Sequence, residues 1–414
     1  MLVALCDPAA AEATRRALDR EGFLDVAAKA FRTASGMIAL PLQRTSEGST
    51  TAASSSLQWS GGTLETAELE PPAGRNERGQ SAALRAACAR AIDAHGVEQS
   101  LRDALLAQEA LPKHWEKLGD VVLFAPAGMF DGKSASGAAL GALSEAARVG
   151  LLAALASALG AQRIGVQGRI EESLHRKSCA RLLWPAACTD GWTVQRDNGI
   201  SYGLDVTRSM FSSGNGTEKA RVARFPCGGE TVVDLYAGIG YFTLAYLVHA
   251  GCAQLHACEW DDDALVALRH NLGANGVAAR CTVYAGDNAR SLPHFAGVAH
   301  RVNLGLIPSS EAGWPIAVGA LRPEGGMLHV HANVGSAADD EAAWTASMLA
   351  SLTTLSRAIG REWRVELVHL ERVKWYAPRI RHVVADVRCS CREVEAGAAA
   401  PAAQQHSSSA AQSK

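Results

Sequence analysis

One segment constrains the fold of this chain more than any other: a strand that enters a glycine turn and continues as a helix. Residues 231–243 read Thr-Val-Val-Asp-Leu-Tyr-Ala-Gly-Ile-Gly-Tyr-Phe-Thr. The β-branched start predicts a buried strand. Gly238 and Gly240 let the backbone turn sharply and approach a ligand with no Cβ in the way. The helix that follows is expected to end at Gly251. This order is typical of a nucleotide-binding α/β domain.

A second strand end follows at the spacing that such a domain requires. Residues 255–259 predict a strand that ends in Glu259, 19 residues after Gly240. A carboxylate at this position is placed to accept both hydroxyls of a ribose. Asp261 is placed to cap the next helix. The core face of that helix is predicted from three leucines spaced by three and four: Leu265, Leu268 and Leu272.

A third strand is predicted at residues 281–285, and it delivers Asp287 and Asn288 to the same edge, where they can meet an adenine. Together the three strand ends would surround an adenosine at the switch point of a doubly wound, mostly parallel sheet. No third glycine follows Gly240 three residues on, which disfavours a pyrophosphate. The residues therefore favour S-adenosylmethionine as the ligand. The alternatives are NAD and a fold that no longer binds any cofactor. Asp234 either contacts this cofactor or fixes the turn by accepting backbone N–H bonds.

The rest of the chain is predicted to form smaller α/β units beside this domain. Residues 45–80 are rich in Ser, Thr, Gly, Glu and Pro and lack a periodic apolar face, which is typical of a linker. The predicted division is a small N-terminal module (1–44, with a helix over 9–21 and a strand over 36–40), a flexible linker or insertion (45–80), a helical segment and middle domain (81–204), the cofactor-binding domain (205–392) and a disordered tail (393–414).

Charge, cysteine usage and hydropathy exclude several classes of protein. The net charge of -2 gives no global basic field, so an RNA site would be a local patch. The ten cysteines include no CxxC pair, which favours reduced cytosolic thiols and no metal site. The longest uncharged apolar run, residues 149–162, is too short to span a bilayer, and the N-terminus lacks a basic signal region. We therefore expect a cytoplasmic protein with no membrane partner.

Two motifs flanking the glycine turn carry a resemblance to a known family. Residues 210–219 read Met-Phe-Ser-Ser-Gly-Asn-Gly-Thr-Glu-Lys, and residues 303–311 read Asn-Leu-Gly-Leu-Ile-Pro-Ser-Ser-Glu. With residues 234–243 between them, they resemble the TRM5/TYW2 family of enzymes that act on position 37 of tRNA. The resemblance firms at residues 111–120 and is good over 197–386. TRM5-like proteins usually carry a short Asn-Leu-Pro after the fourth strand, so the longer motif here is more similar to the TYW2 branch.

The resemblance implies an α/β, class I methyltransferase-like catalytic domain and a specific reaction. TYW2 enzymes transfer the 3-amino-3-carboxypropyl group of S-adenosylmethionine to the wyosine precursor at position 37 of tRNA(Phe), and methylthioadenosine leaves. TRM5 enzymes methylate N1 of guanosine 37 on the same fold. A sulfonium activates all three attached carbons, so the orientation of the methionine arm decides which group moves. Guanine-N1 methylation, or a non-catalytic tRNA-binding scaffold, remains as an alternative.

The same resemblance assigns residues to the two ends of the site. Ser212 and Lys219 match family positions that contact the cofactor, and a lysine ammonium suits the carboxylate of the methionine arm. Asn303 and Pro308 would line the side of the acceptor base. The sequence identifies no general base for the acceptor carbon.

Several other residues suggest RNA contact or catalysis, although a solvated face or core packing is the ordinary explanation for each. Basic side chains interleaved with aromatic ones suit RNA. They occur at Arg372, Lys374, Trp375, Tyr376, Arg379 and Arg381. A second positive cluster comprises Arg208, Lys219, Arg221 and Arg224. Isolated candidates for stacking or chemistry are Trp115, Trp314, His329 and His331.

Overall fold

The structure is a computed structural model that divides into two compact units, Met1–Arg90 and Ala91–Lys414. It describes residues 2–7, 10–21, 31–32, 37–42, 56–59, 62–68, 77–168, 178–188 and 190–391. The predicted tail at 393–414 lies outside these residues.

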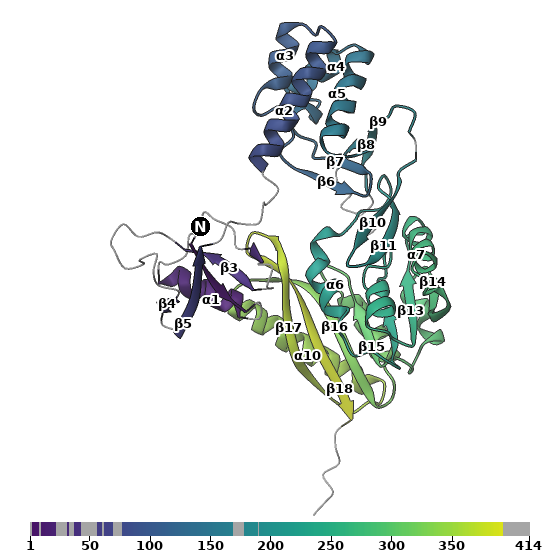
Figure 1. The fold of residues 1–414 in the computed structure, drawn as a ribbon. Helices are drawn as coiled ribbons and strands as arrows, with labels where there is room; N and C mark the ends of the chain where they lie inside the picture. The colour runs from purple at the N-terminus through teal and green to yellow at the C-terminus, as the bar shows by residue number, and fades with distance from the viewer. Residues whose placement is uncertain are drawn as a thin grey trace, which may run out of the picture. The chain divides into compact units, whose positions relative to one another are not determined.

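A seven-stranded sheet forms the centre of the larger unit, in the order β14-β13-β12-β15-β16-β18-β17 (Figure 1). Neighbours from β14 to β16 are parallel, whereas β18 is antiparallel to both β16 and β17. Because the strand order reverses between β12 and β15, the prediction of a doubly wound, mostly parallel sheet is confirmed. The strands are β12 (Thr231–Asp234), β13 (Gln254–Glu259), β14 (Cys281–Ala285), β15 (Arg301–Leu304), β16 (Gly325–Gly335), β17 (Trp363–Ala377) and β18 (Ile380–Cys391).

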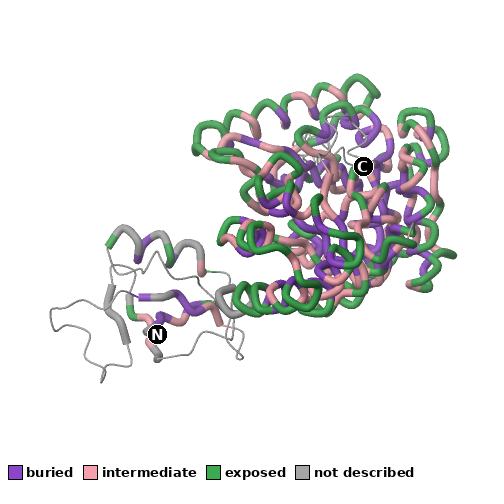
Figure 2. The backbone as a smooth tube through the Cα atoms, turned by 90° about the horizontal axis from the view of Figure 1, so that it is seen from above, coloured by how far each residue is buried: buried purple, intermediate pink, exposed green. Residues whose placement is uncertain are grey.

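Apolar side chains are buried on both faces of this sheet. Val232 and Val233 are both fully buried but belong to different apolar clusters, because successive strand residues point to opposite faces. Figure 2 shows buried segments running through the interior of the larger unit and exposed ones on its outer helices. Its helices outside the middle region are α6 (Gly216–Val222), α7 (Asp262–Ala274), α8 (Asn288–Ser291), α9 (Trp314–Ala320) and α10 (Ala338–Ala358).

Local sequence signals explain where α7 begins and ends. The Asp261 side chain accepts a hydrogen bond from Ala264 N at 2.9 Å, which caps the first turn as predicted. The helix ends at Ala274 with Asn275 as its C-cap, and Gly276 follows with φ 69°. Its predicted apolar face is buried at Leu265, Leu268 and Leu272.

The helix after the glycine turn is present but differs in geometry from a regular α-helix. Most of it is a π-helix at Ala245–His249, in which Ala250 N donates to Ala245 O at 3.1 Å. Gly251, with φ 70°, ends it as predicted. Sequence periodicity does not distinguish these two helix types over so short a stretch.

The middle region shares its core with the cofactor-binding domain. Leu118 and Val121 lie in the same apolar cluster as Tyr202 and Leu255. The hairpin of β10 (Trp192–Asp197) and β11 (Ile200–Asp205) packs on α7, where Asn271 Oδ1 accepts from Gly203 N at 2.6 Å. The hairpin, which the sequence prediction places in the middle domain, also contacts that domain, because Thr193 Oγ1 donates to Asp120 Oδ1 at 2.8 Å. The other elements are α2 (Glu77–Ala94), α3 (Gln99–Leu106), α4 (Ala135–Ala142), α5 (Glu145–Ala158), β6 (Trp115–Leu118), β7 (Val121–Phe124), β8 (Arg163–Val166) and β9 (Arg181–Trp184).

The N-terminal unit corrects one sequence prediction. Its five-stranded sheet has the order β2-β3-β1-β5-β4. The interpretation of residues 45–80 as a linker is wrong for 56–59 and 62–68, which form β4 and β5, and β5 pairs with β1. The polar composition of this segment suggested a linker, but antiparallel strands pair through their backbones and need few apolar side chains. The unit contains β1 (Leu2–Cys6), α1 (Ala11–Arg20), β2 (Phe31–Arg32), β3 (Ile38–Pro41), β4 (Ser56–Trp59) and β5 (Gly62–Glu68).

Within the described ranges, no single helix has the length and apolar character needed to cross a membrane. The successive helices α4 and α5 reach that length only together, and they are bent by 119°.

Candidate functional site

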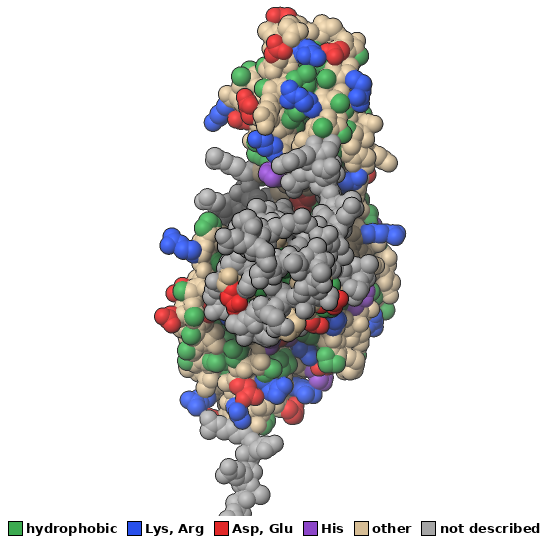
Figure 3. All heavy atoms as spheres, turned by 60° about the vertical axis from the view of Figure 1, so that its left-hand side comes forward, with side chains coloured by type: hydrophobic (Ala, Val, Ile, Leu, Met, Phe, Trp, Pro, Cys, Tyr) green, Lys and Arg blue, Asp and Glu red, His purple; other side chains and the backbone are tan. Residues whose placement is uncertain are grey.

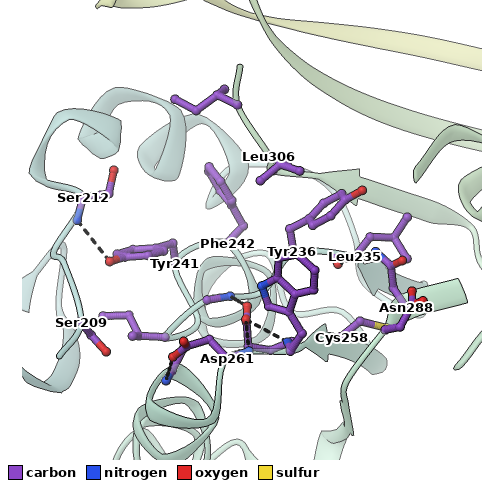
Figure 4. A pocket seen from close by; sticks show the side chains of 18 of the residues that line it. Ser209, Ser212, Leu235, Tyr236, Tyr241, Phe242, Cys258, Asp261, Asn288 and Leu306 are labelled. Carbon is purple, nitrogen blue, oxygen red and sulfur yellow. Dashed lines mark hydrogen bonds between the residues drawn. The ribbon is translucent and has the colours of Figure 1, made fainter. Parts of the chain in front are cut away.

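A cavity of about 520 Å³ opens at the carboxyl ends of β12, β13, β14 and β15. Its volume lies in the range of small-molecule sites. Two groups of residues surround it. The strand-end side comprises Gly238, Glu259, Asp287 and Asn288, and the loop side comprises residues 208–215 and 305–307 that face the cavity. In Figure 4, Ser209 and Ser212 lie across the cavity from Cys258 and Asn288.

The glycine turn forms the floor of the strand-end side. Gly238 has φ 55° and Gly240 has φ 100°, so both adopt a backbone conformation that favours glycine. Gly238 lines the cavity. Gly240 lies outside the lining, and a Cβ built there would be 3.1 Å from Leu268 Cδ1. Gly240 therefore permits close packing of α7, and only Gly238 faces the ligand position.

Glu259 is the most strongly held polar group of the strand-end side. Its Oε2 accepts from Gly238 N at 2.6 Å, and its Oε1 accepts from Trp260 N and Asp261 N, each at 2.9 Å. Burial raises the pKa of Glu259, and the three backbone donors oppose this rise. Glu259 lines the cavity, at the end of β13.

Asp287 and Asn288 also line the cavity, as predicted. Asp287 caps α8 by accepting from Ala289 N at 2.9 Å. Asn288 Nδ2 donates to Leu235 O at 3.1 Å, which ties the end of β14 to the end of β12. These bonds fix both backbones at the edge where the adenine is expected.

Asp234 and Asn303 lie behind the cavity and contact each other. Both are fully buried, and Asn303 Nδ2 donates to Asp234 Oδ1 at 3.0 Å. Thr243 Oγ1 donates to Asp234 Oδ2 at 2.8 Å. Burial raises the pKa of Asp234, and these donors oppose the rise. The assignments of Asp234 to the cofactor and Asn303 to the acceptor base are not met by this geometry, because the two side chains clamp the turn instead.

The second residue predicted on the side of the acceptor base does not face the cavity. Pro308 lies outside the lining, and its carbonyl accepts from Asn333 N at 2.8 Å. Gly305, Leu306 and Ile307 line the cavity in its place. The motif was thus located correctly, but the residues that face the cavity are the three before the proline.

Lys219 is also placed away from the cavity. Its side chain is 3% exposed, and its Nζ lies 2.5 Å from Asp197 Oδ2. The ammonium is 5.0 Å from the Phe211 ring centroid and 5.1 Å from that of Tyr202. This arrangement does not bring Lys219 to the methionine-arm position, whereas Ser212 lines the cavity as expected.

Tyr241 is a functional residue that sequence reasoning missed. It lines the cavity, its hydroxyl donates to Met210 O, and it accepts from Ser212 N at 3.2 Å. Burial raises the pKa of Tyr241, so the hydroxyl stays protonated at neutral pH. Tyr241 therefore holds the loop side against the glycine turn. An aromatic residue directly after the last glycine was the available signal. Asn215, also missed, lines the same side.

The two histidine candidates are buried on β16, outside the cavity lining. His329 belongs to a set of charged groups that we call the buried ion network. Its Nδ1 donates to Asp386 Oδ1 at 2.6 Å, and Asp386 also pairs with Arg221 of α6. Burial lowers the pKa of His329, which keeps it neutral. The network comprises Glu218, Arg221, Glu230, Arg301, His329 and Asp386.

Most members of the positive cluster near residue 215 are neutralised by carboxylates. Arg208 pairs with Asp205 and Asp263. Lys219 and Arg221 are paired as described above, and Arg224 alone is exposed without an ion pair among the described residues. Trp314 is buried, and Trp115 packs edge-on against Phe124 at 6.3 Å. No three His, Cys, Asp or Glu residues of the described ranges gather into a metal site.

Comparisons with known proteins agree with this geometry. The family model described as the TRM5/TYW2 methyltransferase domain matches residues 193–346. The chain is 40% identical over 326 residues to the tRNA wybutosine-synthesizing protein 2 homolog of Bos taurus, covering 67% of this chain and 71% of that protein. It is 46% identical over 292 residues to the tRNA wybutosine-synthesizing protein 2/3/4 of Arabidopsis thaliana, covering 70% of this chain and 27% of that protein. The chain thus spans about a quarter of the length of this plant relative.

Among solved structures, the chain is similar to P. horikoshii TYW2 in complex with MeSAdo. The two are 26% identical with a TM-score of 0.55, over 73% of this chain and 99% of that one.

Proposed function

This chain belongs to the TRM5/TYW2 family, and on that premise we propose that it is an S-adenosylmethionine-dependent transferase that modifies tRNA. The reaction is transfer of the 3-amino-3-carboxypropyl group to the wyosine precursor at position 37 of tRNA(Phe), in wybutosine synthesis. Methylthioadenosine is the second product. The observation that carries the proposal is the similarity to relatives named tRNA wybutosine-synthesizing protein 2 over two thirds of the chain.

The donor set of the strand-end side fits S-adenosylmethionine. A carboxylate has about four acceptor positions. Three backbone N–H groups use part of the Glu259 capacity, which leaves acceptor capacity for a ribose hydroxyl. The Gly238 backbone approaches the cavity without a Cβ, and Asp287 and Asn288 stand at the adenine end. We assign cofactor contact to these four residues and to Ser212, with Asp234 and Gly240 supporting the turn from behind.

When bound, the cofactor supplies a sulfonium with three electrophilic carbons, so the protein must decide which of them faces the RNA. Ser212 and Asn215 line the loop side, and Tyr241 fixes the backbone that carries them. We propose that these residues orient the methionine arm. Lys219 acts indirectly, since its ion pair with Asp197 holds α6.

The acceptor base would enter between the two segments of the loop side, residues 208–215 and Gly305–Ile307. This wall excludes water and orients the base, which is the main contribution required when the electrophile is already reactive. All ten cysteines are free thiols, which supports our proposal of a cytoplasmic location.

The test uses tRNA(Phe) that bears the wyosine precursor and S-adenosylmethionine labelled in its carboxyl carbon. Label on the RNA, with methylthioadenosine released, is the expected result. S-adenosylhomocysteine and unlabelled RNA would point to methyl transfer instead. RNA binding without either product would point to a scaffold. The Glu259→Gln variant serves as the control for turnover that depends on this cavity.

A further inference from the structure

The hairpin formed by β17 and β18 extends past the sheet edge at which the cavity opens. β15 ends at Leu304, opposite Val330 of β16. β16 continues from His331 to Gly335 and stays paired with β18, where Gly335 faces Ile380. Five residues at 3.3 Å each carry these strands roughly 17 Å beyond β15. The hairpin tip therefore projects past the sheet edge at which the cavity opens, on the β16 side of β15.

The tip exposes an unusual amount of aromatic surface. Trp375 is 58% exposed, Tyr376 is 47% exposed and Ile380 is 38% exposed. These three belong to the large apolar side chains that the described chain leaves exposed, and they fall within six residues. Large apolar groups gathered at one exposed place mark interaction sites more often than single ones do.

Arginines accompany the exposed indole. Arg381 is the cross-strand neighbour of Trp375, and its guanidinium carbon lies 4.2 Å from the ring centroid. Arg379 is exposed in the turn. Neither arginine forms an ion pair with any described residue. Arg372, which the sequence grouped with them, is paired with Glu341 of α10, so its charge is already neutralised.

The other face of the tip reaches the loop side of the cavity. Lys374 is the cross-strand neighbour of His382. A Cβ built on Gly214 would collide with the Lys374 side chain, so Lys374 lies directly against this backbone. Gly214 stands between Ser212 and Asn215, which both line the cavity. The hairpin tip is thus continuous with the wall of the proposed acceptor site.

We propose that this tip binds the single-stranded RNA next to the nucleotide in the cavity, with a base stacked on Trp375 and phosphates paired with Arg379 and Arg381. Stacking on aromatic rings and charge pairing with phosphates are the usual means of holding unpaired RNA. The net charge of -2 requires such a local patch. Where Figure 3 shows described residues, Lys and Arg side chains are interspersed with Asp and Glu and form no continuous basic surface. The inference rests on the proposed function for its choice of RNA.

The test compares two double variants on the same two strands. Arg379→Gln with Arg381→Gln removes the tip charges. Arg364→Gln with Arg388→Gln removes the same charge from exposed positions at the opposite end of the hairpin. Binding of a tRNA(Phe) transcript is measured across salt concentrations. The tip variant is expected to lower the slope of log affinity against log salt by about one for each arginine, and the matched variant to leave it unchanged.

Trp375→Ala tests the stacking separately and is expected to weaken RNA binding about tenfold or more. S-adenosylmethionine affinity and the urea midpoint should stay at wild-type values in all these variants. Unchanged RNA affinity in both tip variants overturns the inference, and is also what a protein-docking surface would give. If the tip variants lose RNA affinity but the wild-type protein transfers no label, the proposed function fails and the RNA surface stands.

Discussion

The two sides of the cavity are built by different means. On the strand-end side, Glu259 and Gly238 are 21 residues apart and bond to each other directly. On the loop side, Ser212 is held by Tyr241, and the adjoining helix α6 is held by Asp197 and Asp386. The bonds described for the first side span 53 residues or fewer, whereas the second side depends on a bond between residues 165 positions apart. We therefore expect mutations far from the cavity to weaken cofactor binding through the loop side and to leave the strand-end side intact.

The largest effect is expected from breaking the buried ion network. Asp386→Ala removes the acceptor of His329 Nδ1 and one of the two carboxylates that pair with Arg221, both in a buried place, so the unfolding free energy should fall by about 3–5 kcal/mol. Because α6 loses its anchor, S-adenosylmethionine affinity should fall as well. Urea titration measures the unfolding free energy, and calorimetry measures the S-adenosylmethionine affinity. Glu366→Ala, which breaks the more exposed pair with Arg364, should cost less than about 1 kcal/mol. Equal losses in both variants would contradict this account.

The stability of the protein should depend on pH through His382 of β18. His382 is fully buried beside His331, and burial lowers its pKa from 6.5 to about 4. As pH falls below 6.5, the unfolded chain takes up a proton that the folded chain does not take up until about pH 4. Stability from this group is thus complete above pH 6.5 and declines by about 3 kcal/mol between 6.5 and 4.

The measurement is urea unfolding between pH 7.5 and pH 4.5, compared with His382→Asn, which does not titrate. The variant should show a pH slope smaller by up to about one proton. A slope identical to that of the wild type would show that His382 does not carry this dependence.

The strand-end side is tested by Glu259→Gln. Losing the charge and one acceptor should weaken S-adenosylmethionine binding by about 2–3 kcal/mol, roughly 30- to 150-fold, as for other hydrogen bonds to charged groups. Stability should change less than in Asp386→Ala, because the amide oxygen can still accept from Trp260 N and Asp261 N and only the Gly238 N–H loses its acceptor. Asp262→Asn, on the outer first turn of α7, is the matched control and should bind normally. Binding within a few-fold of wild type in Glu259→Gln would remove this residue from the site.

The smallest effect is expected from Tyr241→Phe. The Met210 carbonyl and the Ser212 N–H each lose a partner, at a cost of about 1 kcal/mol in stability. The KM for S-adenosylmethionine should rise a few-fold because the loop side loosens. Tyr284→Phe removes a comparable hydroxyl bond, to His256, on the edge strand β14 and should leave KM unchanged. A KM that rises equally in both variants would argue against a positioning role for Tyr241.

The sequence by itself determined the strand-end side. Its strands, the helix cap at Asp261 and the cavity positions of Gly238, Glu259, Asp287 and Asn288 all follow from short-range signals, because turns and caps are fixed by residues a few positions apart. Sequence also located the loop motifs and their family.

Only the tertiary structure decided which residues of those motifs face the cavity. Asp234, Lys219, Asn303 and Pro308 each have the right chemistry, yet each lies behind the lining and bonds to another part of the chain. Their partners come from strands and loops that meet only in the folded protein. A buried polar group takes whichever partner the packing supplies, and no local pattern records that choice. The same reason turned the polar segment 56–68 from an expected linker into two paired strands.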